Sequence, residues 1–218
     1  MLSYKENGPL LRNKTLSEVD NMQDNSGKII LDLCGGTGAW SKPYKEAGYD
    51  VRVITLPEYD VRTYWPPESV YGIFAAPPCT EFSLARTTAK TPRNFDLGVS
   101  VLSACLNIIW ECRKKDKLVF WALENPRGLM RQFLGRPPFE FEQWEFGDEG
   151  IKPTDLWGYF NFPKKTVIDR PKDLSKTYPC GSSMAKNWNP RCLPGLTKAD
   201  MRAITPPGFA NAFFKANK

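Results

Sequence analysis

The sequence contains no histidine, and this absence limits the chemistry that the protein can perform. Histidine is the most frequent general acid or base in enzymes, so proton transfer here must use a carboxylate, Lys, Tyr, Cys or water. The six cysteines form no Cys-x-x-Cys pair. Zinc sites are usually built from histidines and paired cysteines, so we predict that the protein holds no metal, with a site near Cys180 and Cys192 as the alternative.

Long apolar runs are also missing. The longest apolar stretch, near residues 97–110, is interrupted by Ser100 and Asn107. No segment reaches the ~20 apolar residues that span a bilayer, and the N-terminal residues lack the apolar core of a secretory signal. These features predict a cytoplasmic protein without membrane contact, in a compartment where disulfides are not expected. The net charge of +6 favours a polyanionic partner such as nucleic acid.

Apolar segments that have the character of buried strands alternate with helical segments in the first part of the chain. The strands are expected in GKIILDL, DVRVITL, VYGIFAA and KLVFWALENP. A mostly apolar helix, buried on most of its circumference, is expected over residues 96–115. The alternation predicts an α/β fold with a parallel sheet that helices cover on both faces. After residue 137, FEFEQWEFG and DLWGYFNF predict further strands, and a C-terminal helix is expected from about Pro207.

The segment DLCGGTG, from Asp32 to Gly38, carries the first strand into a turn with three glycines. Glycines allow the backbone to approach a ligand closely, and the following helix start offers N–H groups. The turn lies at the carboxyl edge of the expected sheet, where α/β folds bind nucleotides, so we favour a cofactor over a tight turn without a ligand. The spacing matches neither a P-loop nor the dinucleotide fingerprint. Asp60 follows the second strand and is either a nucleoside ligand or an ordinary solvated aspartate.

Two polar motifs end the third and fourth strands at the same expected edge. Cys79 follows Pro77 and Pro78, which fix the backbone and would hold the thiol in one direction, as a positioned nucleophile requires. The alternative is a structural cysteine. Glu124 and Asn125 close the fourth strand, where a buried carboxylate without a partner would be costly, and a turn cap is the alternative.

In this order, DLCGGTG, APPCTEFS and ENP resemble the motifs of the DNA cytosine-5 methyltransferases. The terminal RAITPPGFANAFFKA also resembles the closing motif of that family, which packs back against the cofactor site. The compact plan is similar to that of bacteriophage members. The resemblance implies a Rossmann-like, S-adenosylmethionine-dependent methyltransferase fold. The residues expected to bind this cofactor are Asp32, Leu33, Cys34, Gly35, Gly38, Thr55, Leu56, Asp60, Val61 and Pro77.

The resemblance also implies a mechanism. The Cys79 thiolate would add to C6 of a cytosine, Glu124 would hold N3, Asn125 would orient the exocyclic amine, and Pro78 would fix the direction of the nucleophile. A duplex hides C6, so the cytosine must be flipped out of the stack. The base that removes the C5 proton is left open, and water is a candidate.

Several positions depart from the family pattern. The usual Pro-Cys-Gln is Pro-Cys-Thr, and no acidic residue ends the second strand, so Thr55, Leu56 or Glu58 must hold the ribose. The Gln-Arg-Arg motif is not visible, and KPTDLWG stands at about its place. We expect the residues after Cys79 to form a mobile lid over DNA, with an ordinary solvated loop as the alternative. The candidate nucleic-acid contacts are Ser83, Arg86, Lys90, Arg93, Lys152 and Thr154.

The predicted organisation is a catalytic domain over residues 1–162, completed by a helix over 200–218, with a small, irregular target-recognition region over 163–199. That region is rich in Lys, Pro, Ser and Gly. The function implied is methylation of double-stranded DNA by a monomer in a bacterial host cell, for protection from restriction or another marking role. Cytosine-5 methylation of RNA or nucleotides, and a catalytically silent nucleic-acid-binding protein on the same fold, are the alternatives.

Overall fold

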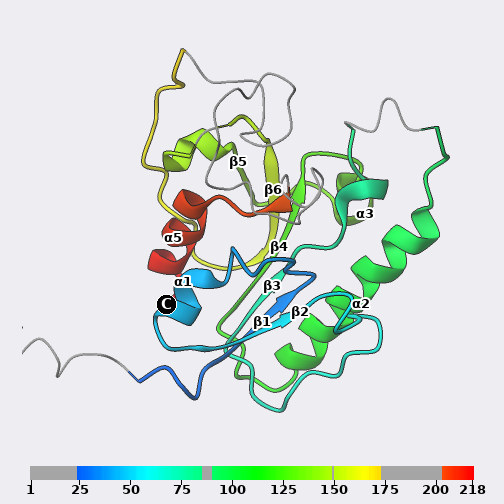
Figure 1. Cartoon of the computed structure of the whole chain (residues 1–218), viewed down its shortest axis with the longest axis vertical. Helices are drawn as coiled ribbons and strands as arrows, with labels where there is room; N and C mark the ends of the chain where they lie inside the picture. The colour runs from blue at the N-terminus through cyan, green and yellow to red at the C-terminus, as the bar shows by residue number, and fades with distance from the viewer. Residues whose placement is uncertain (1–23, 85–89, 149, 173–202) are drawn as a thin grey trace, which may run out of the picture.

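The computed structural model describes residues 24–84, 90–148, 150–172 and 203–218, and it is an α/β structure around one mixed sheet of six strands. Most of the predicted target-recognition region, the predicted nucleic-acid contact Arg86, and Cys180 and Cys192 lie outside these residues. The strands lie in the order β2-β1-β3-β4-β6-β5 (Figure 1). Their bounds are β1 Ile29–Leu33, β2 Asp50–Ile54, β3 Gly72–Ala75, β4 Phe120–Pro126, β5 Phe139–Phe141 and β6 Thr154–Tyr159.

The first four strands are parallel, whereas β6 is antiparallel to β4 and β5 is antiparallel to β6. The predicted parallel sheet is confirmed for the first four strands, and the two strands after residue 137 extend it with antiparallel pairing. A parallel neighbour needs a long crossover, usually a helix. Between β4 and β6 the described residues form the short α3, Arg131–Leu134, the strand β5 and the single-turn η3, Gln143–Phe146, and no helix of the length that such crossovers usually contain. The predicted strand FEFEQWEFG is correct only for its first three residues, because η3 follows.

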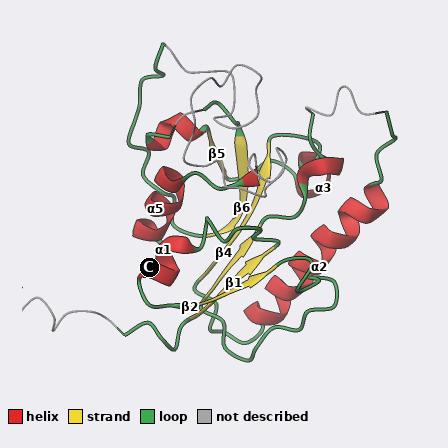
Figure 2. Cartoon of the chain, viewed as in Figure 1, coloured by secondary structure: helices red, strands yellow, loops and turns green. Residues whose placement is uncertain are grey.

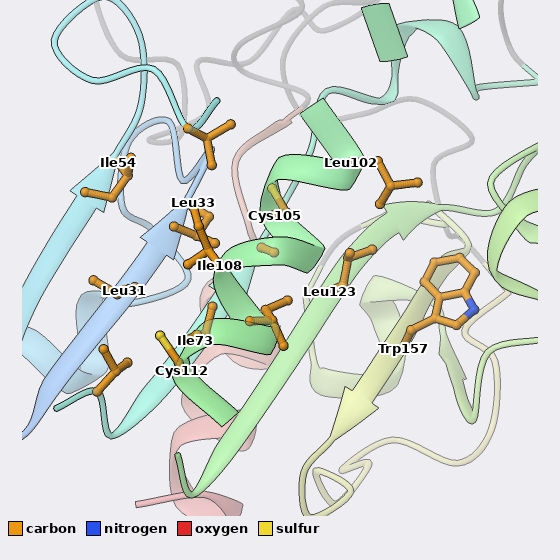
Figure 3. Close-up of a cluster of buried hydrophobic side chains, with 14 of the residues drawn as sticks. Leu31, Leu33, Ile54, Ile73, Leu102, Cys105, Ile108, Cys112, Leu123 and Trp157 are labelled. Atoms are coloured by element: carbon orange, nitrogen blue, oxygen red, sulfur yellow. The ribbon is translucent and has the colours of Figure 1, made fainter. Parts of the chain in front are cut away.

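Helices cover both faces of the sheet, as predicted (Figure 2). On one face, α2, Phe95–Arg113, packs on Leu31, Ile73 and Leu123 (Figure 3). Its buried residues recur every three or four positions and are Gly98, Leu102, Cys105, Ile108, Ile109 and Cys112. Trp110, on the outer side, is 60% exposed. The helix is thus buried along one stripe and not, as expected, around most of its circumference.

By length and composition alone, α2 is apolar enough to cross a membrane, and it is one such helix among the described residues. Core helices of soluble proteins meet the same criterion. In this structure the buried stripe of α2 lies on the sheet, with Leu102 and Cys105 almost fully buried. Packing on the sheet accounts for the apolar residues of this stripe.

On the opposite face, an aromatic core joins the start of the chain to its end. The helices α1, Lys42–Glu46, and α5, Pro207–Ala216, lie together on this face (Figure 1). Phe74 of β3 contacts both Tyr44 of α1 and Phe213 of α5. The Tyr44 hydroxyl donates a hydrogen bond of 3.0 Å to the Asn217 carbonyl. The predicted C-terminal helix from Pro207 is confirmed, and it completes the core from the far end of the chain.

Candidate active site at the strand ends

The ends of three neighbouring strands bring the predicted motifs together. The central strands lie in the order β1-β3-β4 and are parallel, with Leu33 paired to Ala75 and Ala75 paired to Leu123. Because these pairs are in register, the residues that follow them emerge at one edge of the sheet. The glycine turn, the Pro-Pro-Cys segment and the Glu-Asn pair are those residues. The sheet order places the nucleophile segment between the other two motifs.

The glycine turn after β1 approaches its own strand very closely. A Cβ atom added at Gly35 would lie 2.4 Å from the Asp32 Cγ, so a side chain at that position would displace the carboxylate. Gly36 and Gly38 have positive φ angles of 55° and 69°, which favour glycine. Cys34 also has a positive φ, 58°, which is uncommon for a non-glycine residue. The turn is therefore a shaped cradle over the Asp32 carboxylate.

Asp32 is a fully buried carboxylate beneath this cradle. Its Oδ2 accepts a hydrogen bond of 2.6 Å from the Ser41 hydroxyl, while its Oδ1 has no hydrogen-bond partner among the described residues. Burial raises the pKa of Asp32 from 3.8 to about 6, and hydrogen bonds from Ser41 offset this effect in part. A buried acceptor without a donor is costly, so the site is suited to a ligand that brings a positively charged donor.

A second contact under the turn joins it to α2. The Cys34 thiol accepts a hydrogen bond from the buried thiol of Cys105, which holds the pKa of Cys34 below its usual range. Burial and the negative charges of Asp32 and Asp60 oppose this shift. Neither Ser41 nor Cys105 was predicted as part of the site. The sequence contains no motif that links Ser41 to Asp32 or Cys105 to Cys34, because these residues meet only through tertiary packing.

The residues after β2 lie in several environments. Asp60 is the acceptor for the backbone N–H and the guanidinium of Arg62, and these hydrogen bonds lower its pKa to about 2. Thr55 is half-buried, and Leu56 is exposed. Val61 is buried in the core, as is Leu33, so their side chains support the site from below. A cavity of about 430 Å³ between residues 61–66 and α2 includes Val61 in its lining.

The nucleophile segment begins with a buried Pro77 and continues through Pro78 into η2, Cys79–Glu81. The Asn125 side chain, only 1% exposed, donates a hydrogen bond of 2.9 Å to the Pro77 carbonyl. The Asn125 Oδ1, the atom that could accept from a substrate amine, is buried and has no hydrogen-bond partner among the described residues, so the expected contact to an exocyclic amine stays a prediction. Cys79 itself is partly exposed and is not in a disulfide. Asn125 thus links the end of β4 directly to the approach of the nucleophile.

Glu124 lies next to Lys152, with 3.7 Å between the carboxylate and the ammonium. The Lys152 side chain is 12% exposed, so it faces the carboxylate from β4 and not an external phosphate. Thr154 is buried, and its hydroxyl donates to the Lys152 carbonyl at 3.1 Å. The expectation that Thr154 contacts nucleic acid is therefore corrected, because its side chain has no exposed surface to offer. Lys152 remains a neighbour of the predicted chemistry.

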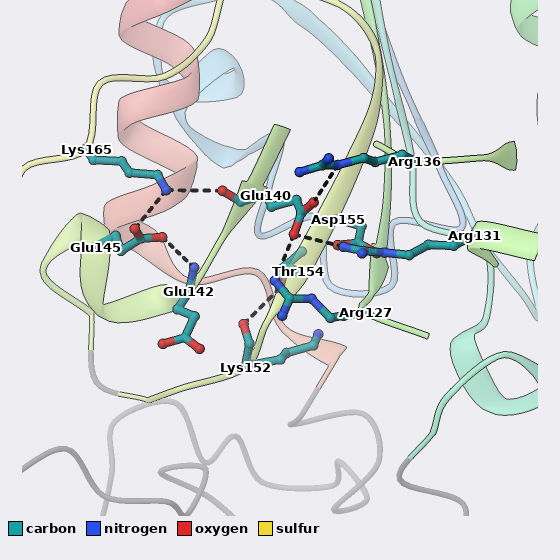
Figure 4. A network of polar contacts seen from close by, with 10 residues as sticks. All are labelled: Arg127, Arg131, Arg136, Glu140, Glu142, Glu145, Lys152, Thr154, Asp155 and Lys165. Carbon is teal, nitrogen blue, oxygen red and sulfur yellow. Dashed lines mark hydrogen bonds and ion pairs between the residues drawn. The ribbon is translucent and has the colours of Figure 1, made fainter. Parts of the chain in front are cut away.

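A charged network supports this end of the sheet (Figure 4). Arg131 donates to both oxygens of the fully buried Asp155, at 2.7 and 2.6 Å. It also lies 2.9 Å from Glu140 of β5, which pairs with Arg127 as well. Lys165 contacts Glu145 at 2.7 Å and so ties the start of the predicted recognition region to η3. These arginines are paired with carboxylates, and they fix β6 and β5 beside β4.

The described candidates for nucleic-acid contact near Cys79 differ in exposure. Lys90 is exposed, whereas Ser83 is half-buried and pairs with Gly128 through an isolated bridge. The Arg93 guanidinium donates to the carbonyls of Glu81 and Ser83, at 2.8 and 2.9 Å. The expectation that Arg93 grips phosphate is corrected, because its donors hold the chain on either side of Phe82. This role was not visible from the sequence.

Among the described residues, no group of three or more Cys, Asp or Glu side chains is placed to hold a metal ion. The chemistry that the described groups can supply is therefore a thiol nucleophile, a carboxylate paired with an ammonium, and a buried acceptor under a glycine turn. A comparison with family models finds no match to the chain, and a comparison with curated proteins finds none either.

Proposed function

We propose that this protein is a DNA cytosine-5 methyltransferase with a Rossmann-like, S-adenosylmethionine-dependent fold. The observation that carries the proposal is the hydrogen bond from Asn125 to the Pro77 carbonyl, which joins the Glu-Asn motif to the Pro-Pro-Cys motif. The mixed sheet with helices on both faces is compatible with such a fold. The three motifs at one sheet edge are those that resemble the family.

The residues present fit the proposed cofactor. S-adenosylmethionine carries an ammonium group, and the unpartnered, buried Oδ1 of Asp32 is an acceptor suited to it. A side chain at Gly35 would clash with this carboxylate, so the glycine allows the turn to lie directly against it. Asp60 and the loop after β2 lie beside the same turn, since the Asp60 charge acts on Cys34. When bound, the cofactor would supply the electrophilic methyl group.

The residues of the chain would perform the remaining steps. The Cys79 thiolate adds to C6 of a flipped cytosine and makes C5 nucleophilic. Glu124 holds N3 and stabilises charge that develops on the ring. Lys152 keeps this carboxylate in place. After C5 has gained the methyl group, loss of its proton to a base such as water and departure of the Cys79 thiolate restore the aromatic ring.

The direct test is incubation of the protein with labelled S-adenosylmethionine and separate samples of duplex DNA, RNA and free nucleotides. We expect label in duplex DNA, at cytosine C5, and none with Cys79→Ser. Label in RNA or nucleotides alone would assign the activity to the second enzyme class. Binding of nucleic acid without any label in any substrate would favour a silent binding protein.

A further inference from the structure

The segment that carries Cys79 has little structure of its own. It consists of the short η2 and its exit, where the N–H groups of Phe82 and Ser83 both donate to the Cys79 carbonyl, at 3.0 and 2.8 Å. The Phe82 side chain is fully buried and anchors the segment in the core. The position of the thiol therefore depends on what holds this segment from its two sides.

On one side, the loop between β4 and α3 holds the segment through its backbone. The Leu129 N–H donates to the Phe82 carbonyl at 2.8 Å, and Ser83 forms an isolated bridge with Gly128. A Cβ atom at Gly128 would lie 2.4 Å from the Phe82 carbonyl oxygen, so the two chains are in close contact. With the bond from Asn125 to Pro77, this side is fixed at several points along its length.

On the other side, the residues before α2 hold the segment mainly through one side chain. The two terminal nitrogens of Arg93 donate to the carbonyls of Glu81 and Ser83, at 2.8 and 2.9 Å. The Glu81 carboxylate in turn accepts a hydrogen bond of 2.8 Å from the Asn94 N–H, and Asn94 caps α2 through the Leu97 N–H. The first turn of α2 and the nucleophile segment are thus one connected unit.

We propose that Arg93 is a positioning residue for the nucleophile, and not a phosphate contact. Its planar guanidinium presents two parallel donors that span the carbonyls on either side of Phe82, which a lysine ammonium cannot do in the same geometry. Arg93 thereby fixes the Cys79 segment to the residues that precede α2. The effect of Arg93 on catalysis rests on the proposed role of Cys79 in methyl transfer. The two hydrogen bonds that Arg93 donates to the segment can be tested without that role.

The structural test uses Arg93→Lys and Arg93→Gln in the full-length protein, without DNA or cofactor. Hydrogen exchange of the amides of Phe82, Ser83 and Leu129 should become at least about ten-fold faster in both variants, since each loses charge-assisted hydrogen bonds. Exchange in β1, β3 and β4 should stay unchanged. The matched control is Arg113→Lys, in the exposed last turn of the same helix, which should leave all these amides as in the wild type.

The functional test separates positioning from DNA binding. Arg93→Lys should lower kcat by about ten- to a hundred-fold, because a small displacement of a nucleophile is costly. The affinity for DNA, and its dependence on salt, should stay as in the wild type. A phosphate contact predicts the opposite: Arg93→Lys would stay active, and Arg93→Gln would reduce the salt slope by about 0.9.

Unchanged hydrogen exchange at the three amides would show that Arg93 does not hold the Cys79 segment, whatever the activity. Faster exchange with an unchanged kcat would overturn the positioning role. If the wild type methylates no nucleic acid, the proposed function fails, and the exchange result still decides whether Arg93 holds the segment.

Discussion

The buried Asp32 gives a quantitative prediction, because its cost to stability depends on pH. Its pKa is 3.8 in an exposed chain and about 6 in the folded protein, as a result of burial. At about 1.36 kcal/mol for each pH unit, this difference corresponds to about 3 kcal/mol. The folded state binds the proton more tightly, so the stability that protonated Asp32 contributes is fully present below pH 3.8 and is lost as pH rises through about 6.

Asp32→Asn removes the charge while keeping the shape. The free energy of unfolding of the variant, minus that of the wild type, should increase with pH between about 4 and 6. At higher pH this difference should stay constant at about 2–3 kcal/mol. Urea denaturation followed by tryptophan fluorescence, repeated from pH 4 to 8, measures this difference. Asp169→Asn, at an exposed position, is the control and should show none of it.

The same variant should lose the proposed cofactor. Millimolar S-adenosylmethionine should stabilise the wild type, by about 2.7 kcal/mol at a hundred times its Kd, and should leave Asp32→Asn unchanged. The wild type would then retain a destabilising carboxylate for the sake of binding. A stability difference that does not vary with pH, or a variant no more stable than the wild type at pH 8, would refute this account of Asp32.

Four further outcomes are expected. Cys79→Ser should lose methyl transfer but keep the fold and cofactor binding, and DNA with 5-fluorocytosine should trap a covalent adduct, seen by mass spectrometry, only when Cys79 is present. Asn125→Ala should lower stability by about 1–3 kcal/mol in urea denaturation and reduce kcat more than it changes KM, because it releases the Pro77 carbonyl. Gly98→Ala should destabilise by no more than about 2 kcal/mol in the same assay, because a gain of about 1 kcal/mol in helix propensity offsets part of the overpacking of its Cβ, 3.1 Å from the Phe82 ring. Bisulfite sequencing of methylated plasmid should reveal a short target of about two to four base pairs, bound with strong salt dependence, because lysines that grip phosphate predominate in residues 163–199. The candidate readers are Lys164, Lys165, Arg170, Lys172, Lys176, Lys186, Asn187, Asn189 and Arg191, and those beyond residue 172 lie outside the described residues. A single long recognition site would contradict this last expectation, and methylation only in the presence of a host extract would point to a partner that reads the DNA.

Local pattern was enough to predict the elements that position the site. Runs of apolar residues marked β1 to β4, and the strand-to-helix turn at Asp32–Gly38 was visible from its glycines. Since parallel strands end at one edge, the sequence also predicted that Cys79 and Glu124 would lie near this turn. These features depend on the chemistry of neighbouring residues, which a single sequence contains.

Tertiary structure alone decided which polar groups meet across the chain. Arg93 was read as a phosphate contact because it is a basic residue in a loop, yet two backbone carbonyls lie within reach of its guanidinium. Thr154 was read as exposed, yet it is buried beside Lys152. Charge and residue type do not reveal whether a side chain faces solvent or a carbonyl brought close by folding.

The orientation of β5 and β6 was also decided by tertiary structure. β5 was predicted from the alternation in FEFEQWEFG, and β6 from DLWGYFNF as a short strand, but such local patterns do not specify a neighbour or an orientation. β6 pairs antiparallel to β4, and the network around Arg131 and Asp155 holds it beside that strand. The sequence by itself thus determined the strands and their reactive ends, while the packing of distant segments decided the sheet's final order and the partners of its polar side chains.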